Sequence, residues 1–288
     1  MARIAHIAVK VEDIGRTSKL YRDVFGFAHT GTHITPAGAA NEHTHTTQHL
    51  CDGSIDLALV YYSEDHGEPN ALPAEGIDHI GIADSDLAAA AERIKSNGGE
   101  VIGAPGVEPM KFRMPGGIIA EVISEGRFTV DHLAKTASKG RQRMLDAGRV
   151  PPENDLTATA IDDPAQRGEH APLIASVALK VNDGEGAALF LKNAFGFKDA
   201  VCHGLTESNS VCVTDGAVTV EIVDLRLAGA KESPSTHHFG IDAGKTGTEQ
   251  AAATLRKLGC ELNNDRDTRT KLFRMPGEAI TSGLVSDH

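Results

Sequence analysis

The sequence predicts an α+β fold built from four strand–helix–three-strand (βαβββ) modules, arranged as two tandem pairs. Two observations carry this prediction. Short apolar runs, typical of half-buried or buried strands, surround one helix-like stretch in each module. The same order of segments then occurs twice: IASVALKV (Ile174–Val181) echoes IAHIAVKV (Ile4–Val11), and FRMPG stands at both Phe112–Gly116 and Phe273–Gly277. Ordered self-similarity of this kind indicates an internal duplication.

The first module is expected within residues 1–62. An amphipathic helix is predicted over Asp13–Phe25, and Gly26 would end it. The Asp52-Gly53 pair predicts a tight turn between the last two strands. The strands that these signals delimit are Ile4–Val11, Phe27–Thr35, Thr44–Cys51 and Ile55–Tyr62.

The second module is expected within residues 76–124, after a loop over Ser63–Glu75. Its first strand contains GIDHIGI (Gly76–Ile82), and its helix is predicted over Asp84–Asn97 with Asp84 or Ser85 as the N-cap. The remaining strands are predicted at Glu100–Gly103, Val107–Met114 and Gly117–Ser124.

These modules define the domain organisation. Residues 1–128 form one domain, 129–172 form a linker with a helix candidate at Asp131–Ala147, and 173–288 form a second domain. By the repeat register, Ser176 matches His6, His238 matches His79 and Ser282 matches Glu121.

Composition limits the classes of function. The formal charge of −12 argues against a nucleic-acid-binding surface, and no apolar run is long enough to span a bilayer. The chain begins directly in strand pattern, so we expect a cytoplasmic protein without a signal peptide. Its four cysteines form no CxxC pair and are expected to be free thiols.

A metal site is the chemistry that the residues favour. His6, His79 and Glu121 each stand alone in a strand-like apolar run, and two histidines with one carboxylate are suitable ligands for a divalent metal. Strand alternation puts small residues beside each histidine, which leaves room for an ion and a substrate. A lone buried Glu121 would be costly, and a cation would remove that cost.

The duplication provides an internal control. The second half keeps His238 but has serines at the two other positions, so we expect one working site, in the N-terminal half. Asp56 is a further candidate, either facing the same concavity as a catalytic carboxylate or lying in water near its turn. Glu221 stands in the approximately corresponding place of the second half.

Three further residues, His49, Lys111 and Arg113, are candidates for the pocket. His43, His45 and His49 share one strand face, as a second metal site, a proton relay or a solvated rim, and His49 is nearest to apolar surroundings. Lys111 and Arg113 could hold an anionic group of the substrate. Arg274 repeats Arg113 in the second half, so a structural role explains that arginine as well.

The N-terminal start IAHIAVKVEDIGRTSKLYRDVFGF, the stretch GIDHIGIADSDLAAAAERIKSNGGEVIG and the end MPGGIIAEVIS resemble the vicinal oxygen chelate superfamily, which includes glyoxalase I, bleomycin resistance proteins and type I extradiol dioxygenases. The resemblance covers residues 1–128 well and 173–288 more weakly. It implies two tandem glyoxalase-like domains with cupped mixed sheets. It also implies a divalent metal (Fe, Mn, Zn, Ni or Co) held by His6, His79 and Glu121. Asp56 falls where glyoxalase I has a glutamate ligand.

The resemblance implies a small-molecule substrate that binds the metal through two adjacent oxygens, and three functions remain open. One is a glyoxalase- or epimerase-like lyase or isomerase in which a carboxylate, Glu121 or Asp56, moves a proton, and this interpretation is preferred. The alternative is an extradiol-like ring-cleaving dioxygenase with Fe(II), although Gly103–Ala120 lacks the histidine and tyrosine of those enzymes. The third is a binding protein without catalysis. Family precedent also implies a homodimer.

Overall fold

The computed structural model describes residues 2–35, 45–62, 76–128, 172–202, 210–227, 229, 233–264, 270–274 and 282–285. His43, the loop over Ser63–Glu75 and the helix candidate Asp131–Ala147 lie outside these residues, so the predictions made for them stay predictions.

The N-terminal half forms one eight-stranded sheet in the order β2-β3-β4-β1-β5-β8-β7-β6. Two helices accompany it, α1 (Ile14–Phe25) and α2 (Leu87–Ser96). The strands are β1 (Arg3–Lys10), β2 (Ala28–Thr35), β3 (His45–Cys51), β4 (Asp56–Tyr61), β5 (Gly76–Asp84), β6 (Glu100–Ile102), β7 (Met110–Arg113) and β8 (Ile119–Ser124).

The C-terminal half repeats this arrangement with the strand order β10-β11-β12-β9-β13-β16-β15-β14. Its helices are α4 (Gly184–Phe195) and α5 (Gly244–Lys257). The strands are β9 (Leu173–Val181), β10 (Lys198–Asp199), β11 (Ser210–Thr214), β12 (Thr219–Asp224), β13 (Ser235–Asp242), β14 (Glu261–Asn264), β15 (Thr270–Arg274) and β16 (Ser282–Val285).

The predicted fold class is confirmed. Both sheets are mixed, because β1 pairs parallel with β4 and antiparallel with β5, and β9 pairs in the same two ways with β12 and β13. Each sheet therefore joins two βαβββ modules of the same half through its central antiparallel pair. On this basis we propose the domain boundaries that the sequence predicts, at residues 128 and 173.

The helix ends follow local sequence signals. The Asp13 side chain accepts a hydrogen bond from the Arg16 amide at the start of α1, and Gly26 ends the helix in the left-handed conformation, at φ 65°. The N-cap predicted for α2 was wrong: Asp86 holds that place. Strand β5 continues through Asp84, whose carboxylate instead pairs with Arg93 and the Asp86 amide.

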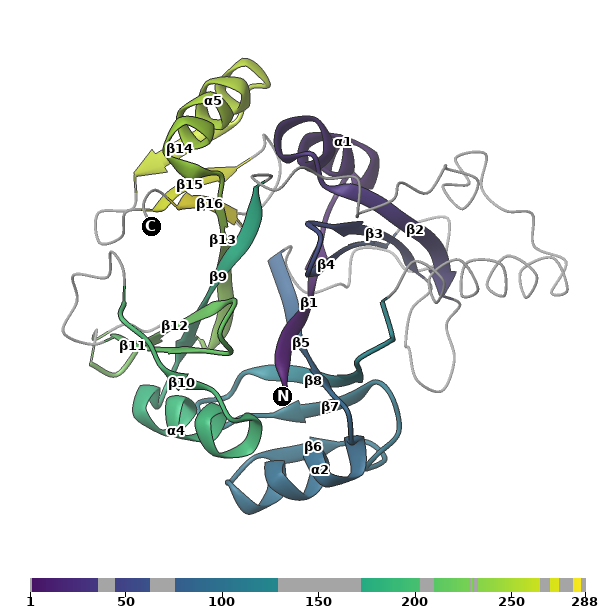
Figure 1. Ribbon diagram of the computed structural model, residues 1–288, viewed down its shortest axis with the longest axis vertical. Coiled ribbons are helices and arrows are strands. Elements are labelled where there is room, and N and C mark those ends of the chain that lie inside the picture. Colours follow the sequence, from purple (N-terminus) through teal and green to yellow (C-terminus); the bar gives the residue numbers. More distant parts are fainter. Residues whose placement is uncertain are drawn as a thin grey trace, which may run out of the picture.

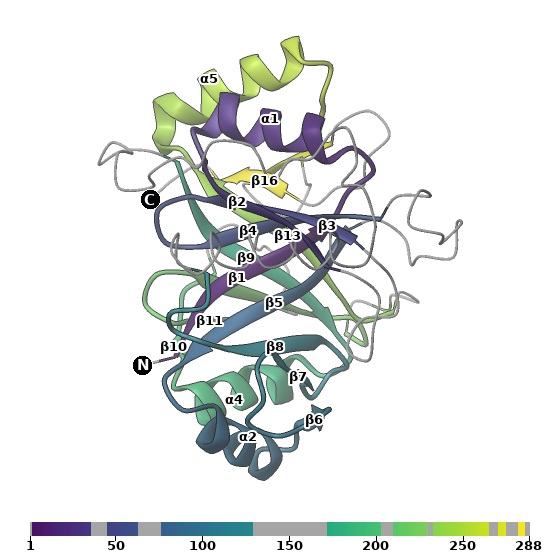
Figure 2. The same ribbon diagram turned by 90° about the vertical axis from the view of Figure 1, so that its right-hand side faces the viewer.

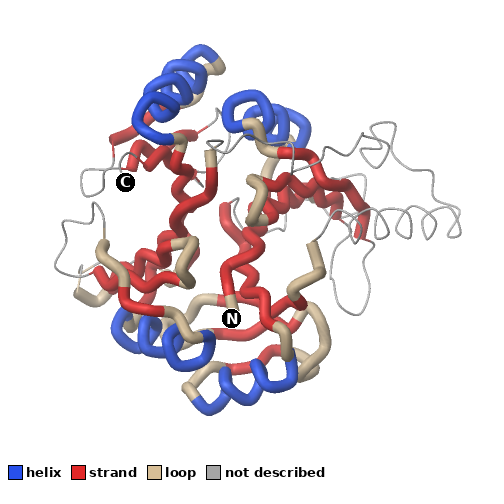
Figure 3. The backbone as a smooth tube through the Cα atoms, viewed as in Figure 1, coloured by secondary structure: helices blue, strands red, loops and turns tan. Residues whose placement is uncertain are grey.

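The two sheets lie back to back, with their concave sides facing outward in opposite directions (Figures 1 and 3). Helix α1 packs beside α5 at one end and α2 beside α4 at the other, and the turned view shows the same pairing (Figure 2). A single apolar core runs through both halves, including the contact of Phe112 with Phe190 and Phe195. Burial of each such ring contributes about 1.5–3 kcal/mol.

Two equivalent aspartates tie the halves together. Asp52 accepts hydrogen bonds from the Ser54 and Ile55 amides of its own turn, and its second oxygen accepts one from the Ile174 amide at 2.7 Å. Asp215 does the same in the other half and accepts from the Ile4 amide at 2.6 Å. Each half therefore helps to hold the β3–β4 or β11–β12 turn of the other.

The strand register corrects two predicted equivalences. Glu121 pairs with Gly81 on β5 and with Lys111 on β7. In the second half, the equivalent residues Gly240 and Leu272 both pair with Gly283. Gly283, and not Ser282, therefore occupies the place of Glu121. Phe112 pairs with Ala120, eight positions later, whereas its repeat Phe273 pairs with Ser282, nine positions later. The connection between β15 and β16 is therefore one residue longer than that between β7 and β8.

The strand register also shows that the predicted equivalence of Glu221 with Asp56 was wrong. Asp56 pairs with His6, and Thr219 pairs with the equivalent Ser176, so Thr219 and not Glu221 occupies its place.

The expectation that every cysteine is a free thiol was wrong for one pair. Cys202 and Cys212 form a disulfide with their Cα atoms 5.3 Å apart, whereas Cys51 and Cys260 are not disulfide-bonded. The pairing of β10 with β11 brings them together, since the Ala200 amide donates to the Cys212 carbonyl. None of the helices in the described part of the chain has the length and apolar character that a bilayer crossing requires.

Candidate metal centre

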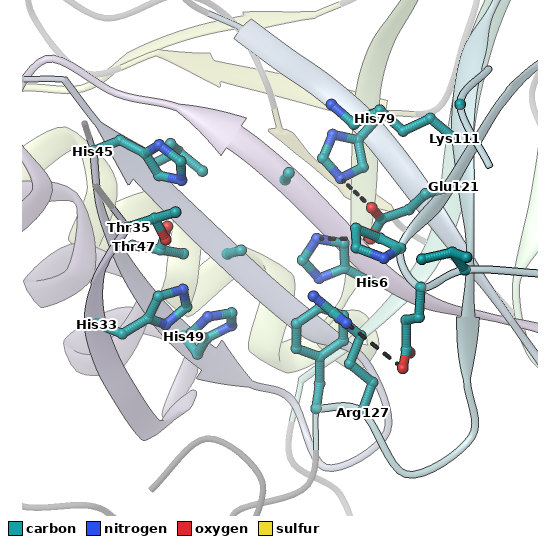
Figure 4. A pocket seen from close by; sticks show the side chains of 18 of the residues that line it. His6, His33, Thr35, His45, Thr47, His49, His79, Lys111, Glu121 and Arg127 are labelled. Atoms are coloured by element: carbon teal, nitrogen blue, oxygen red, sulfur yellow. Dashed lines mark ion pairs between the residues drawn. The ribbon is translucent and has the colours of Figure 1, made fainter. Parts of the chain in front are cut away.

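His6, His79 and Glu121 come together on the concave side of the first sheet (Figure 4). They lie on the adjacent strands β1, β5 and β8, and the register places His6, Gly81 and Glu121 in one row across the sheet. One potential ligand atom from each side chain lies within 4.8 Å of the others. In the described residues this is the only such group of three or more histidine, cysteine or acidic side chains.

Gly81 makes room for this arrangement. A Cβ atom added there would lie 2.7 Å from the Cβ of His6, a separation that packed side chains do not tolerate. Gly240 occupies the equivalent place in the second sheet, where a Cβ would lie 2.5 Å from the Ser176 hydroxyl. The duplicated fold therefore keeps this close approach, although only the first half puts a histidine beside it.

Two aspartates orient the histidines from behind. His6 Nδ1 lies 2.7 Å from Asp56 Oδ2, and His79 Nδ1 lies 2.7 Å from Asp78 Oδ2. Because an ionised carboxylate only accepts hydrogen bonds, each Nδ1 carries the proton. The Nε2 atoms face Glu121, at 3.8 Å from His6 and 3.5 Å from His79. A carboxylate behind each histidine is the arrangement that orients imidazole ligands toward a metal.

The electrostatics of the cluster reflect its burial. Burial lowers the pKa of His6. Burial also lowers the pKa of His79, but the carboxylates of Glu121 and Asp78 outweigh it and raise the pKa to about 9. Burial raises the pKa of Glu121, and the histidines, His79 foremost, outweigh it and bring the pKa to about 2. In the metal-free cluster the proton on His79 balances the charge of the buried Glu121 carboxylate. A bound cation would balance the same charge.

Asp56 bridges two histidines. Besides His6, it accepts a hydrogen bond from His49 Nδ1 at 2.9 Å. Burial raises its pKa, but His49 and His6 outweigh it and bring the pKa to about 2. The carboxylate lies behind these two rings and is not among the residues that line the cavity. Asp56 is therefore placed to orient histidines, and it is not part of the three-residue cluster.

The cluster opens into a cavity of about 660 Å³. Its far wall carries His33, His45 and His49 from β2 and β3 (Figure 4). His33 and His49 stack with ring centroids 5.0 Å apart, and burial lowers the pKa of His33 to about 3. His49 Nε2 is buried and has no hydrogen-bond partner in the described chain.

The three predicted pocket residues do not all reach this cavity. His49 and Lys111 line it. Lys111 lies opposite Glu121 in the β7–β8 pair. Arg113 lies outside the lining residues, and its guanidinium instead faces Glu100 on the neighbouring strand at 3.5 Å.

Arg127 and Phe128 are among the cavity residues to which the sequence did not point. Arg127 and Phe128 follow β8 and close over the cluster. Phe128 stacks on His6, with centroids 4.2 Å apart and planes 11° from parallel. Arg127 lies over the Phe128 ring at 5.4 Å and faces Glu108 at 3.6 Å. Both residues stand in a turn after the last strand, where no periodic signal marks the direction of a side chain.

The equivalent place in the second sheet lacks this donor set. The row that holds His6, Gly81 and Glu121 in the first sheet holds Ser176, Gly240 and Gly283 in the second. His238 remains there without a carboxylate at the position of Glu121.

Comparison with known proteins identifies the family. Residues 3–121 match the family model described as the Glyoxalase/Bleomycin resistance protein/Dioxygenase superfamily. The match covers most of the N-terminal half, the part of the chain whose sequence motifs resemble this superfamily. A comparison with curated proteins returns no significant match.

Solved structures of this fold resemble the whole chain. A triple mutant of 4-hydroxymandelate synthase from Streptomyces coelicolor has a TM-score of 0.58 at 14% identity, over 99% of this chain and 92% of that one. The 2,3-dioxygenase LapB from a Pseudomonas species has a TM-score of 0.59 at 14% identity, over 99% and 93%. A hypothetical protein from Staphylococcus aureus has a TM-score of 0.52 at 10% identity, over 100% of both chains. At these identities the likeness concerns the fold alone.

Proposed function

We propose that the protein is an Fe(II)-dependent dioxygenase that cleaves a small aromatic substrate bearing two adjacent hydroxyl groups. The observation that carries this proposal is His49, whose Nε2 is buried at the cavity without a partner in the described chain, while its Nδ1 is held by the same carboxylate that holds His6. The sequence alone favours a lyase or isomerase. We prefer the dioxygenase because Asp56, which falls where glyoxalase I has a glutamate ligand, accepts hydrogen bonds from two histidines and leaves three metal ligands.

The donor set fits a divalent ion. Two imidazole nitrogens and one carboxylate converge from three adjacent strands, and the Nδ1 bonds to Asp56 and Asp78 leave both Nε2 lone pairs directed at Glu121. Bound ferrous iron would supply electrons and open coordination positions for oxygen and for two adjacent substrate oxygens. A fourth protein ligand, as in glyoxalase I, is missing from the cluster because Asp56 points to His6 and His49.

His49 acts as the general base in this proposal. Its Nε2 accepts the proton of a substrate hydroxyl, and Asp56 stabilises the imidazolium that results. Phe128 covers His6 and excludes water from that side of the cluster. Ring cleavage consumes one O₂ for each substrate, breaks one carbon–carbon bond of the ring and leaves both oxygen atoms in the product.

A lyase or isomerase remains the second candidate because of one observation. Gly103–Ala120 contains neither histidine nor tyrosine, and these residues precede the glutamate in the extradiol enzymes that the sequence resembles. In that case His49 would move a proton between carbon atoms of a substrate chelated in the same way, without oxygen.

Oxygen consumption tests the proposal. Protein reconstituted with Fe(II) in the absence of air should consume one O₂ per catechol once oxygen is admitted, and mass spectrometry with ¹⁸O₂ should find both labelled atoms in the product. His49→Ala should retain stoichiometric iron and lose about 100- to 10,000-fold in turnover. Absence of oxygen uptake, together with isomerisation or cleavage by protein loaded with Zn, Ni, Co or Mn, would refute the dioxygenase and support the lyase or isomerase.

Two coarser proposals accompany this function. We propose a homodimer, which light scattering after gel filtration would test, and a cytoplasmic location, which cell fractionation would test.

A further inference from the structure

Building on the proposed function, we infer that Arg127, assisted by Lys111, binds a carboxylate on the substrate, so that the substrate is an aromatic diol acid and not an uncharged diol. Both cations line the cavity that contains the candidate metal centre. In the close view of the cavity, Lys111 lies near His79 and Arg127 lies on the side of His6 (Figure 4).

Arg127 is held in place but retains free hydrogen-bonding capacity. Its guanidinium lies over the Phe128 ring, and one terminal nitrogen faces Glu108 at 3.6 Å, which is too long for a hydrogen bond. Glu108 uses its other oxygen to accept from the amide and hydroxyl of Ser124. Arg127 Nε is buried and has no hydrogen-bond partner among the described residues.

A free guanidinium edge suits an anionic group with two accepting oxygens, such as a carboxylate. Nε and a neighbouring terminal nitrogen form a planar fork that matches the two oxygens of a carboxylate. The cation–π contact with Phe128 helps to hold the guanidinium in place before the ligand arrives. A buried N–H without a partner is costly, so a ligand that accepts from it gains affinity.

Lys111 adds a second positive charge. It projects from β7 opposite Glu121, and no ion-pair partner for it is present in the described parts of the chain. Arg113, two residues later on the same strand, is instead paired with Glu100 outside the cavity. The two neighbouring cations of this strand therefore differ in their availability to a ligand.

The charge of the cavity points the same way. Its described lining has two cations, Lys111 and Arg127, and two carboxylates, Glu108 and Glu121. With neutral histidines these four charges cancel, so a bound divalent ion would make the lining positive. The ionised Asp56 and Asp78 behind the histidines, and Lys10 beside Asp78, reduce this excess to one positive charge, which an anionic substrate offsets. The chain as a whole carries a formal charge of −12, so the two cations of this cavity are a local concentration of positive charge.

Paired ligands test the inference without relying on turnover. The dissociation constants of 3,4-dihydroxybenzoate and 3,4-dihydroxybenzamide are measured by calorimetry on the full chain loaded with Zn(II), at low and high salt. The benzoate should bind at least about tenfold more tightly than the amide. Arg127→Gln should bring the ratio close to one and leave the affinity for the amide within about twofold. Arg127→Lys should restore only part of the ratio, because lysine lacks the fork.

Lys111→Gln should lower the ratio by about two- to fivefold, and Arg113→Gln is the matched control that should leave it unchanged. Equal binding of both ligands to the wild type, or an unchanged ratio in Arg127→Gln, would overturn the inference. Oxygen uptake by the iron-loaded protein with both ligands at equal affinity would refute the inference alone. A preference for the benzoate without oxygen uptake would refute the dioxygenase alone.

Discussion

Asp56→Asn tests how the structure prepares the candidate metal centre. Asp56 accepts hydrogen bonds from Nδ1 of both His6 and His49, at 2.7 and 2.9 Å. An asparagine of nearly the same shape has only one accepting oxygen, and its amide group donates. His49 Nδ1 lies 2.9 Å from both oxygens and His6 Nδ1 lies 2.7 Å from Oδ2 alone, so the amide group would face His49 in one orientation and both histidines in the other. A histidine that faces the amide group must move its proton to Nε2 or turn away. If His6 does so, its Nε2 no longer has a lone pair for a metal.

The structure gives the size of the effect. Loss of a carboxylate behind a metal-binding histidine typically lowers metal affinity about 10- to 100-fold, or about 1.4–2.8 kcal/mol. His49 and His6 bring the pKa of Asp56 to about 2 despite burial, which favours its ionised form by about 2 kcal/mol relative to an exposed aspartate. A neutral asparagine lacks that contribution, so the free energy of unfolding of the metal-free protein should fall by a similar amount. By the same linkage, the contribution is present above pH 3.8 and lost as pH falls through about 2.

The assay is a Zn(II) titration against a chelator of known affinity, with urea unfolding of the metal-free protein. Asp78→Asn is the matched control, because Asp78 holds only His79 among the histidines and its side chain is 30% exposed. It should cost less than tenfold in affinity. Zn(II) affinity of Asp56→Asn within about twofold of the wild type would refute the proposed tautomer and the orienting role of Asp56.

Three other outcomes are expected. Alanine at any one of the three clustered positions should abolish stoichiometric metal binding, whereas His238→Ala should leave the metal content unchanged; elemental analysis decides. Zn(II) affinity should rise with pH up to about 9, with release of close to one proton at pH 7.5 in calorimetry, because the pKa of His79 is raised to about 9 and the metal displaces its proton. Gly81→Ala should displace His6, lower the free energy of unfolding by about 1–3 kcal/mol and abolish metal binding, as urea unfolding and metal titration would show. Gly126→Ala is the control, because an added Cβ there meets no atom within 4 Å, and it should change neither stability nor metal binding.

Much of the fold follows from local patterns in the sequence. Alternation in β1 and β5 places His6 and His79 on the side opposite the core residues Ile7 and Ile80, and the structure has them there. Glu121 could be added because a single carboxylate in an apolar strand requires a partner. The internal repeat made these inferences stronger, because the same motifs occur in both halves while only the first half has His6 and Glu121 at the positions of the cluster.

Contacts between distant strands were beyond the same reasoning. Whether Asp56 reaches the metal or the histidines depends on the parallel register of β4 against β1, which no local pattern encodes. The place of Gly283 depends on one extra residue in a connection, a change that equal spacing from FRMPG cannot detect. Arg127 follows a strand without periodicity, so its position over Phe128 emerges only from the folded chain.

The second half of the chain has a physical role even though its described residues form no metal cluster like that of the first half. Asp52 lies four residues before Asp56, and its turn is closed by hydrogen bonds to the Ser54 and Ile55 amides and to the Ile174 amide of the second half. Asp56 in turn fixes His6 and His49. The backbone of β9 therefore supports the turn before β4, and β4 carries the aspartate that orients His6 and His49. Removal of the second half would therefore remove the support of this turn and part of the common core.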